Sequence, residues 1–312
     1  MGVTIARSNW PAPVGRLVDA GGNSFYVIEV GTGPAVLFLH GGGPGCHGWS
    51  DFGPVVPGFA RHRKCVVIDL LQYGQSDKPV ILGPVWDFHA KKILALLDAM
   101  GLGGIDLVCN SWGGSAGLRL ASLAPERVRT ITVTGSMPVL HGALTPLRGS
   151  GRGAAGTALG GRARAWYYGG EGPSREKMRK LIGKLEWYKS ELVPDATVSA
   201  RYKASIEPEE RRLSAEPRER GEQQDLADVI VQLVMPVLFL WGMHDPFMPL
   251  DYPLMLANLA PVGQFATIAK AAHHPQEERP RTYTGLVEAF LDTEGEPYPL
   301  TISTDREAGA DA

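Results

Sequence analysis

A serine with a small residue two positions away on either side, Cys109 and Gly113, marks the most informative stretch of the chain. Residues 105–109 are apolar except for Asp106 and predict a short strand, and Ser111 follows that strand almost at once. Gly113 and Gly114 come next and open a run of small and apolar residues typical of a helix start. A serine at such a strand-to-helix turn projects its hydroxyl beyond the sheet and tolerates only small neighbours. Ser111 could equally cap the helix, so this stretch alone leaves both interpretations open.

A serine hydroxyl needs a base to become a nucleophile, and the base needs an acid to orient it. Asp245 follows the apolar run 237–241, and His273 follows the run 265–268. Taken separately, Asp245 could cap a turn and His273 could be a surface histidine. Together with Ser111 they form a set of three residues, each just past a predicted strand, which predicts a catalytic triad.

Glycines also gather where an earlier strand ends. The run 35–39 is continuously apolar, as expected for a strand buried on both faces, and residues 41–45 then contain four glycines and one proline. Such a backbone can turn sharply and aim its N–H groups at one point, which is what stabilising an oxyanion requires. A flexible loop is the alternative, but the position at a strand end favours function.

Composition limits the partners of the chain. Its 312 residues are 44% hydrophobic, and 31 basic residues nearly balance 33 acidic ones, for a net charge of −2. No charge excess would attract nucleic acid or an anionic membrane, and the longest apolar stretch, 229–243, is interrupted and too short to span a bilayer. The three cysteines are scattered and odd in number, which favours a reducing compartment. We therefore expect a cytoplasmic protein with a small-molecule substrate and no nucleic-acid or membrane partner; a homodimer is compatible with this composition.

Strands alternate with helices, which predicts a mostly parallel central sheet flanked by helices, with chemistry at the carboxyl ends of its strands. The alternation stops after the sixth strand and resumes near residue 226. We therefore assign 1–135 and 226–292 to the core, 136–225 to an inserted helical lid, and 293–312 to a disordered tail.

Within the lid, the glycine-rich segment 148–164 predicts a mobile surface loop, and the stretch 207–222 predicts a solvated connection because it is rich in charge and proline. A helix is expected over residues 197–205.

The chain order serine, aspartate, histidine is that of the α/β-hydrolase fold. Over residues 20–292 the chain resembles the meta-cleavage product hydrolases, serine-dependent carbon–carbon bond hydrolases of aromatic degradation. The segments that carry the resemblance are 40–45 with 48–50, 110–114, 242–249 and Arg201. The resemblance implies an oxyanion hole made by Gly42, Gly43 and the N–H of Trp112. It also implies that Asn110 and Arg201 bind the oxygens and carboxylate of the substrate.

Three residues depart from the pattern of that family. Asp51 stands where the family usually has Asn, His274 where it has Trp, and Cys109 where the elbow has glycine. We expect Asp51 and His274 to contact the substrate, but a carboxylate near the pocket opposes an anionic substrate unless it is paired. These departures call into question whether the substrate is a dienoate, but they leave the expectation of serine hydrolase chemistry unchanged.

Three functions remain open at this point. The first is hydrolysis of a carbon–carbon bond in a vinylogous diketone acid, the second is hydrolysis of an ester or lactone by the same triad, and the third is a non-catalytic receptor on this fold. A serine at the elbow disfavours dehalogenases and Asp-dependent epoxide hydrolases. No cofactor is expected. We expect no metal either, because His244, Asp245, His273 and His274 lack a known ligand spacing and adjacent side chains point apart.

Overall fold

The computed structural model describes residues 12–139 and 152–293 and contains an eight-stranded sheet in the order β1-β2-β4-β3-β6-β7-β9-β10. Strand β2 pairs antiparallel with β1 and with β4, and the remaining pairs are parallel. The strands are β1 Arg16–Ala20, β2 Asn23–Val30, β3 Ala35–Leu39, β4 Lys64–Ile68, β6 Ile105–Asn110, β7 Val128–Thr134, β9 Val237–Gly242 and β10 Gly263–Ile268. The predicted mostly parallel central sheet is confirmed.

Parallel pairing gathers the functional segments at one edge of the sheet. Leu39, the last residue of β3, is in register with Cys109 near the end of β6. Every residue of β6 and of β9 is buried, as expected for central strands covered on both faces. The loops that follow β3, β6, β9 and β10 therefore leave a rigid base side by side.

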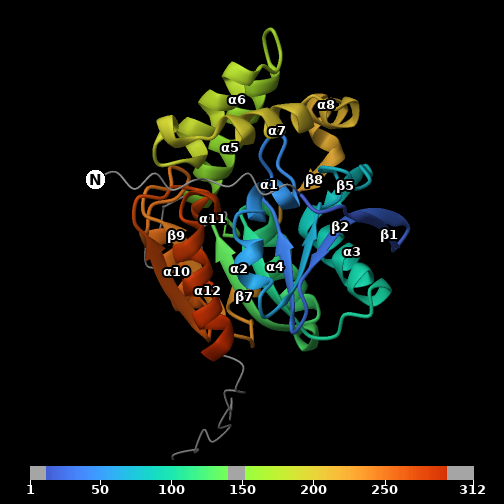
Figure 1. Cartoon of the computed structure of the whole chain (residues 1–312), viewed down its shortest axis with the longest axis vertical. Helices are drawn as coiled ribbons and strands as arrows, with labels where there is room; N and C mark the ends of the chain where they lie inside the picture. The colour runs from blue at the N-terminus through green and yellow to red at the C-terminus, as the bar shows by residue number, and fades with distance from the viewer. Residues whose placement is uncertain (1–11, 140–151, 294–312) are drawn as a thin grey trace, which may run out of the picture.

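Helices cover both faces of the sheet (Figure 1). Side chains of α3, α4, α9 and α10 pack into one apolar core, whereas α2 and α12 pack into the core on the opposite face. These helices and the short α1 and α11 span α1 Gly48–Phe52, α2 Val56–Phe59, α3 Val85–Ala99, α4 Trp112–Leu123, α9 Ala227–Ile230, α10 Asp251–Leu259, α11 Pro275–Glu278 and α12 Pro280–Thr293.

Four further helices lie together at one end of the molecule (Figure 1). These insertion helices are α5 Arg152–Tyr168, α6 Arg175–Leu181, α7 Asp195–Ser205 and α8 Pro208–Ala215. Three of them, α5, α6 and α7, share a small apolar cluster of their own, which includes Tyr167, Met178 and Val198. A two-stranded sheet of β5 Ile81–Pro84 and β8 Arg220–Glu222 ties the end of this insertion to the core. The insertion helices fall within 136–225, and their action as a lid stays a prediction.

Two local predictions were wrong. The described part of the segment 148–164, residues 152–164, belongs to helix α5 and is not a loop. At Gly156 this helix lies against Met137 and Met248, so that a Cβ would collide with both side chains. Residues 207–222 form α8 and β8, and Glu210 and Arg220 are buried. In both cases tertiary contacts override composition. The tail predicted over 293–312 falls, apart from Thr293, outside the described residues.

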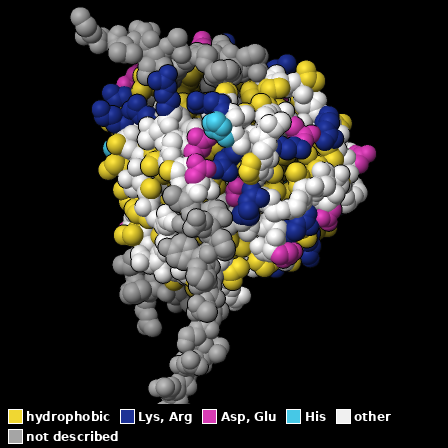
Figure 2. Space-filling model, turned by 60° about the horizontal axis from the view of Figure 1, so that its bottom comes forward, with side chains coloured by type: hydrophobic (Ala, Val, Ile, Leu, Met, Phe, Trp, Pro, Cys, Tyr) yellow, Lys and Arg dark blue, Asp and Glu magenta, His cyan; other side chains and the backbone are white. Residues whose placement is uncertain are grey.

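The surface agrees with the balanced composition. On the face in Figure 2, basic and acidic side chains are interspersed with apolar ones. Within the described part of the chain, no helix has the length and apolar character needed to cross a bilayer.

Gly113 allows the closest packing of α4 on the sheet. A Cβ at this position would strike the backbone oxygen of Leu39, which cannot move without displacing β3. We expect Gly113→Ala to lower the free energy of unfolding by about 2–3 kcal/mol. Chemical denaturation is the measurement.

Gly103 provides the control, because a Cβ there would meet nothing within 4 Å. Gly103→Ala should change the free energy of unfolding by less than about 0.5 kcal/mol. Equal effects of the two substitutions would contradict the packing account.

Candidate active site

Ser111 occupies a strained turn between β6 and α4. Its backbone dihedrals are φ 49° and ψ −112°, a region that residues with a Cβ rarely adopt. The turn is held because the Ser111 N–H donates to the carbonyl of Thr134, the last residue of β7, at 2.7 Å. The geometry is that of a nucleophile elbow, with Ser111 raised at the carboxyl edge of the sheet.

Cys109 replaces the elbow glycine without disturbing this turn. A Cβ on Gly117 would lie 2.8 Å from the Cys109 sulfur, so the absence of a side chain on α4 makes room for the thiol. Cys109 is fully buried, and burial raises the pKa of its thiol far above the ordinary value. The thiol therefore acts as a small apolar group.

His273 and Asp245 form a buried hydrogen-bonded pair. His273 Nδ1 lies 2.9 Å from Asp245 Oδ2, and the side chains of both residues are almost fully buried. The other carboxylate oxygen accepts the N–H of Phe247 at 2.8 Å, which fixes the carboxylate. With Nδ1 donating to Asp245, Nε2 of His273 is left as the acceptor of a proton.

Contacts around β7 bring this pair beside the elbow. Asn110, the residue before Ser111, donates its side-chain N–H to the His273 carbonyl at 3.1 Å. A Cβ on Gly135, next to the residue that holds Ser111, would lie 2.8 Å from His273 Cε1. Asn110 Oδ1 is buried and has no hydrogen-bond partner among the described residues, so it can accept a hydrogen bond from a bound molecule.

The glycine run follows β3 and lies directly against the elbow. We call residues 40–45 the glycine loop. A Cβ on Gly42 would come 3.0 Å from the Trp112 Cβ, and one on Gly41 would come 3.4 Å from the Ser111 Cβ. The backbone of the loop therefore reaches the segment that carries Ser111, as the oxyanion prediction requires.

Asp51 holds the glycine loop by a hydrogen bond to its backbone. Its carboxylate accepts the Gly41 N–H and the Ser50 hydroxyl, both at 2.8 Å. Burial alone would raise the pKa of Asp51, but the charges of His274 and Arg201 and the hydrogen bond from the Gly41 N–H hold the pKa below its ordinary value. Asp51 is therefore an ionised, fully buried acceptor.

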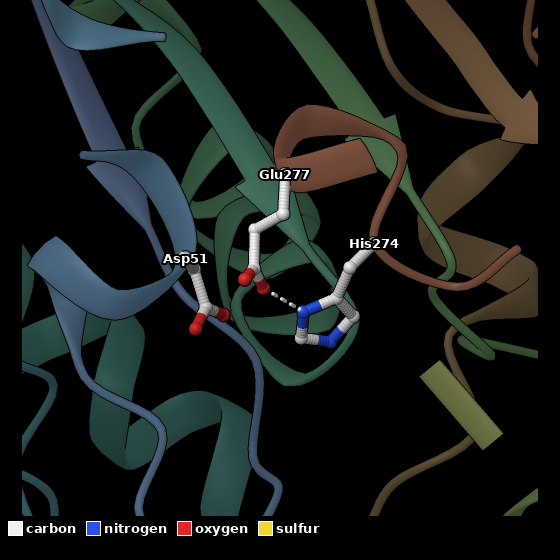
Figure 3. Close-up of side chains that lie close together, drawn as sticks. All are labelled: Asp51, His274 and Glu277. Carbon is white, nitrogen blue, oxygen red and sulfur yellow. Dashed lines mark hydrogen bonds and ion pairs between the residues drawn. The ribbon is translucent and has the colours of Figure 1, made fainter. Parts of the chain in front are cut away.

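His274 and Glu277 face Asp51 across a small space (Figure 3). His274 Nδ1 lies 2.6 Å from Glu277 Oε1, and both residues are buried. Burial by itself would lower the pKa of His274, but Glu186, Glu277 and Asp51 raise it to about 9. Burial raises the pKa of Glu277 to about 7, against the effect of His274. The imidazolium form of His274 therefore prevails at neutral pH.

Arg201 completes the charged cluster and is not free. Its two terminal nitrogens each lie 2.9 Å from an oxygen of Glu186, and its Nε donates to the Pro44 carbonyl at 2.9 Å. The side chain is fully buried. This geometry does not support the prediction that Arg201 binds a substrate carboxylate, because its guanidinium already forms a bidentate ion pair.

Asp51, His274 and Glu277 form the group of described residues that could surround a cation, since their ligand atoms lie within 4.8 Å of one another. The charges nearby are already matched, however. Protonated His274 and Arg201 oppose Asp51 and Glu186, and the raised pKa of Glu277 lets it hold a proton. The cluster is satisfied by ion pairs and hydrogen bonds without a metal.

No sequence pattern assigned a role to Arg164, Glu186 or Glu277. The structure brings all three to this region, where Arg164 Nη2 donates to the Gly42 carbonyl at 3.0 Å. Glu277 could have been found, because it lies three residues after His274 at the start of a short helix. Glu186 comes from an irregular turn of the insertion, and only the folded chain brings it to Arg201.

Comparisons with known proteins agree with this geometry. The family model of the alpha/beta hydrolase fold matches residues 34–152. The chain is 30% identical to the 2-hydroxy-6-oxo-2,4-heptadienoate hydrolase of Pseudomonas putida strain F1, over 92% of this chain and 99% of that relative. It is 31% identical to the 2-hydroxymuconate semialdehyde hydrolase of Pseudomonas sp. strain CF600, over 89% of this chain and 94% of that relative.

Among solved structures, it is similar to the 2-hydroxy-6-oxo-6-phenylhexa-2,4-dienoate hydrolase of Rhodococcus sp. strain RHA1, with a TM-score of 0.76 and 25% identity over 89% of this chain and 98% of that one. The fold and the elbow thus define a hydrolase with the α/β-hydrolase fold. Within that fold family, the chain belongs to the meta-cleavage product hydrolases.

The raised pKa of His274 predicts a pH-dependent contribution to stability. A group whose pKa rises on folding, here from 6.5 to about 9, stabilises the folded state fully below about pH 6.5 and loses that contribution as the pH rises through 9. The contribution is up to about 3 kcal/mol. We expect the melting temperature of the wild type to exceed that of His274→Gln by several degrees at about pH 6.

By about pH 10 this difference should have largely vanished. His62→Gln, at an exposed histidine, is the control and should stay near the wild type throughout. A difference between wild type and His274→Gln that does not change with pH would contradict the assigned charge.

Proposed function

We propose that this enzyme hydrolyses a carbon–carbon bond in a vinylogous diketone acid, a small-molecule substrate of the meta-cleavage product type, by means of Ser111, His273 and Asp245. The hydrogen bond between His273 Nδ1 and Asp245 Oδ2 at 2.9 Å, beside the strained Ser111 turn, is the observation that supports it most. The names of the relatives point to dienoate keto acids.

Chemistry assigns each residue a role. His273 Nε2 takes the proton of Ser111 or of a water that Ser111 positions, and the oxygen attacks the ketone carbon. The carbon–carbon bond breaks with its electron pair on the dienoate fragment, where conjugation delocalises the charge and a proton is taken up. Addition of one water in total yields a carboxylic acid and the protonated dienoate fragment.

The negative charge that develops on the ketone oxygen needs donors. We assign these to the backbone N–H groups of Gly42, Gly43 and Trp112, because the glycine loop and the elbow are in contact. Preorganised donors of this kind are each worth about 10²–10³-fold in rate. Asn110 Oδ1, unpartnered in the described structure, is available for a hydroxyl of the substrate.

Ester or lactone hydrolysis is the second candidate, and Asp51 is the observation that favours it. An ionised carboxylate accepts hydrogen bonds but cannot donate one, and it repels an anionic substrate unless it is compensated. The charge of His274 supplies such compensation, so Asp51 does not exclude an acidic substrate.

Ser111→Ala tests the proposal. We expect turnover of a coloured dienol keto acid to fall by about 10³-fold or more, because the nucleophile or water-positioning hydroxyl is lost. The fold and substrate binding should persist, since only one oxygen is removed. Absorbance at the substrate band measures both bound substrate and its loss.

Aryl esters and lactones of similar size are assayed in parallel with wild type and Ser111→Ala. A higher kcat/KM for the keto acid supports carbon–carbon cleavage, whereas preference for esters supports the second candidate. Turnover of the keto acid that survives in Ser111→Ala would overturn the triad assignment.

A further inference from the structure

The glycine loop is held at every carbonyl from residue 40 to residue 44. This matters because glycine backbone is otherwise the most mobile kind, and an oxyanion donor must not move. The carbonyls of residues 40, 41, 42, 43 and 44 accept, in that order, from Gly113 N–H (3.0 Å), His40 Nδ1 (2.6 Å), Arg164 Nη2 (3.0 Å), Cys46 N–H (3.0 Å) and Arg201 Nε (2.9 Å).

Gly42 is held on both sides by side chains. His40 Nε2 accepts the Leu70 N–H at 2.9 Å, so its Nδ1 carries the proton and donates it to the Gly41 carbonyl. A trans peptide points its N–H opposite to its carbonyl, so this bond also sets the direction of the Gly42 N–H. The bond from Arg164 to the Gly42 carbonyl sets the next peptide plane, and with it the Gly43 N–H.

Arg164 reaches the loop from the insertion. It belongs to α5, and its other terminal nitrogen donates to Glu210 at 3.1 Å and to Ser214 at 2.8 Å, both on α8. Glu210 is buried, and the guanidinium lies over the ring of Tyr168. The planar fork of arginine can make these bonds and the bond to Gly42 at once, which a lysine cannot.

We propose that Arg164 is a positioning residue that fixes the oxyanion donors of the glycine loop from α5. Arg164 does not touch the reacting atoms; it acts through the Gly42 carbonyl. The insertion therefore supplies part of the support for catalysis. This inference rests on the proposed function, because it takes the loop N–H groups as the donors.

Arg164→Met tests the role, since Met keeps most of the apolar stem and removes every donor. We expect kcat to fall about 10- to 100-fold with KM within about twofold, because misplaced donors weaken binding of the transition state and not of the substrate. The inhibition constant of a trifluoromethyl ketone, which forms a tetrahedral oxyanion at Ser111, should rise by the same factor as kcat falls.

Two variants separate this role from a general effect on the insertion. Ser214→Ala removes another bond of the same guanidinium and leaves the bond to Gly42, and Arg162→Met alters an exposed arginine on the same helix. Both should keep kcat within about twofold. Arg164→Lys should recover part of the loss, and it replaces Arg164→Met if that variant fails to fold.

Unchanged kcat in Arg164→Met, an equal fall in Ser214→Ala, or a change in KM alone would overturn the inference. The outcome is separable from that of the proposed function. Activity that persists in Ser111→Ala counts against the triad, whereas an inactive Ser111→Ala with a fully active Arg164→Met counts against the positioning role alone.

Discussion

The structure depends on the close approach of the glycine loop, the elbow and the His273 segment at one edge of the sheet. Gly113 presses α4 against the backbone of β3, and Gly42 lies against Trp112. The strained φ of Ser111 persists because the Thr134 carbonyl and the packing of α4 determine it from both sides. Small residues at these contacts allow the segments that follow three separate strands to come close enough to form one site.

Buried charge is the second constraint. Asp51, Glu186 and Glu277 lie close to His274 and Arg201, all out of water, and burial of such groups is costly unless each finds a partner. Here each has one, and the cluster connects the glycine loop, through Asp51, to the segment that follows His273. Asp51 and His274 both differ from what resemblance to the family leads one to expect. In the structure the two side chains lie within 4.8 Å of each other, and the carboxylate compensates the imidazolium.

The sequence was informative where local chemistry and strand order determine the outcome. The strand ends, the elbow at Ser111 and the pairing partners Asp245 and His273 follow from apolar runs and chain order, and the structure places the aspartate and histidine in contact. The insertion was less predictable. Residues 152–168 are rich in glycine, yet they form a helix because packing on Met137 and Met248 and the bonds of Arg164 stabilise it.

The position of Arg201 shows the same limit. Resemblance can assign the residue a role, but only tertiary contacts reveal that Glu186 and the Pro44 carbonyl already engage it. Neither partner carries a sequence pattern that points to Arg201, since the three segments meet only in the folded chain.

Product analysis in ¹⁸O-labelled water tests the account most directly. The purified enzyme is given a dienol keto acid, and both fragments are quantified by mass spectrometry. We expect equal amounts of carboxylic acid and dienoate fragment, with one labelled oxygen in the acid and none in the dienoate. An intact carbon–carbon bond in the recovered substrate, under conditions in which the same enzyme hydrolyses an ester, would contradict it.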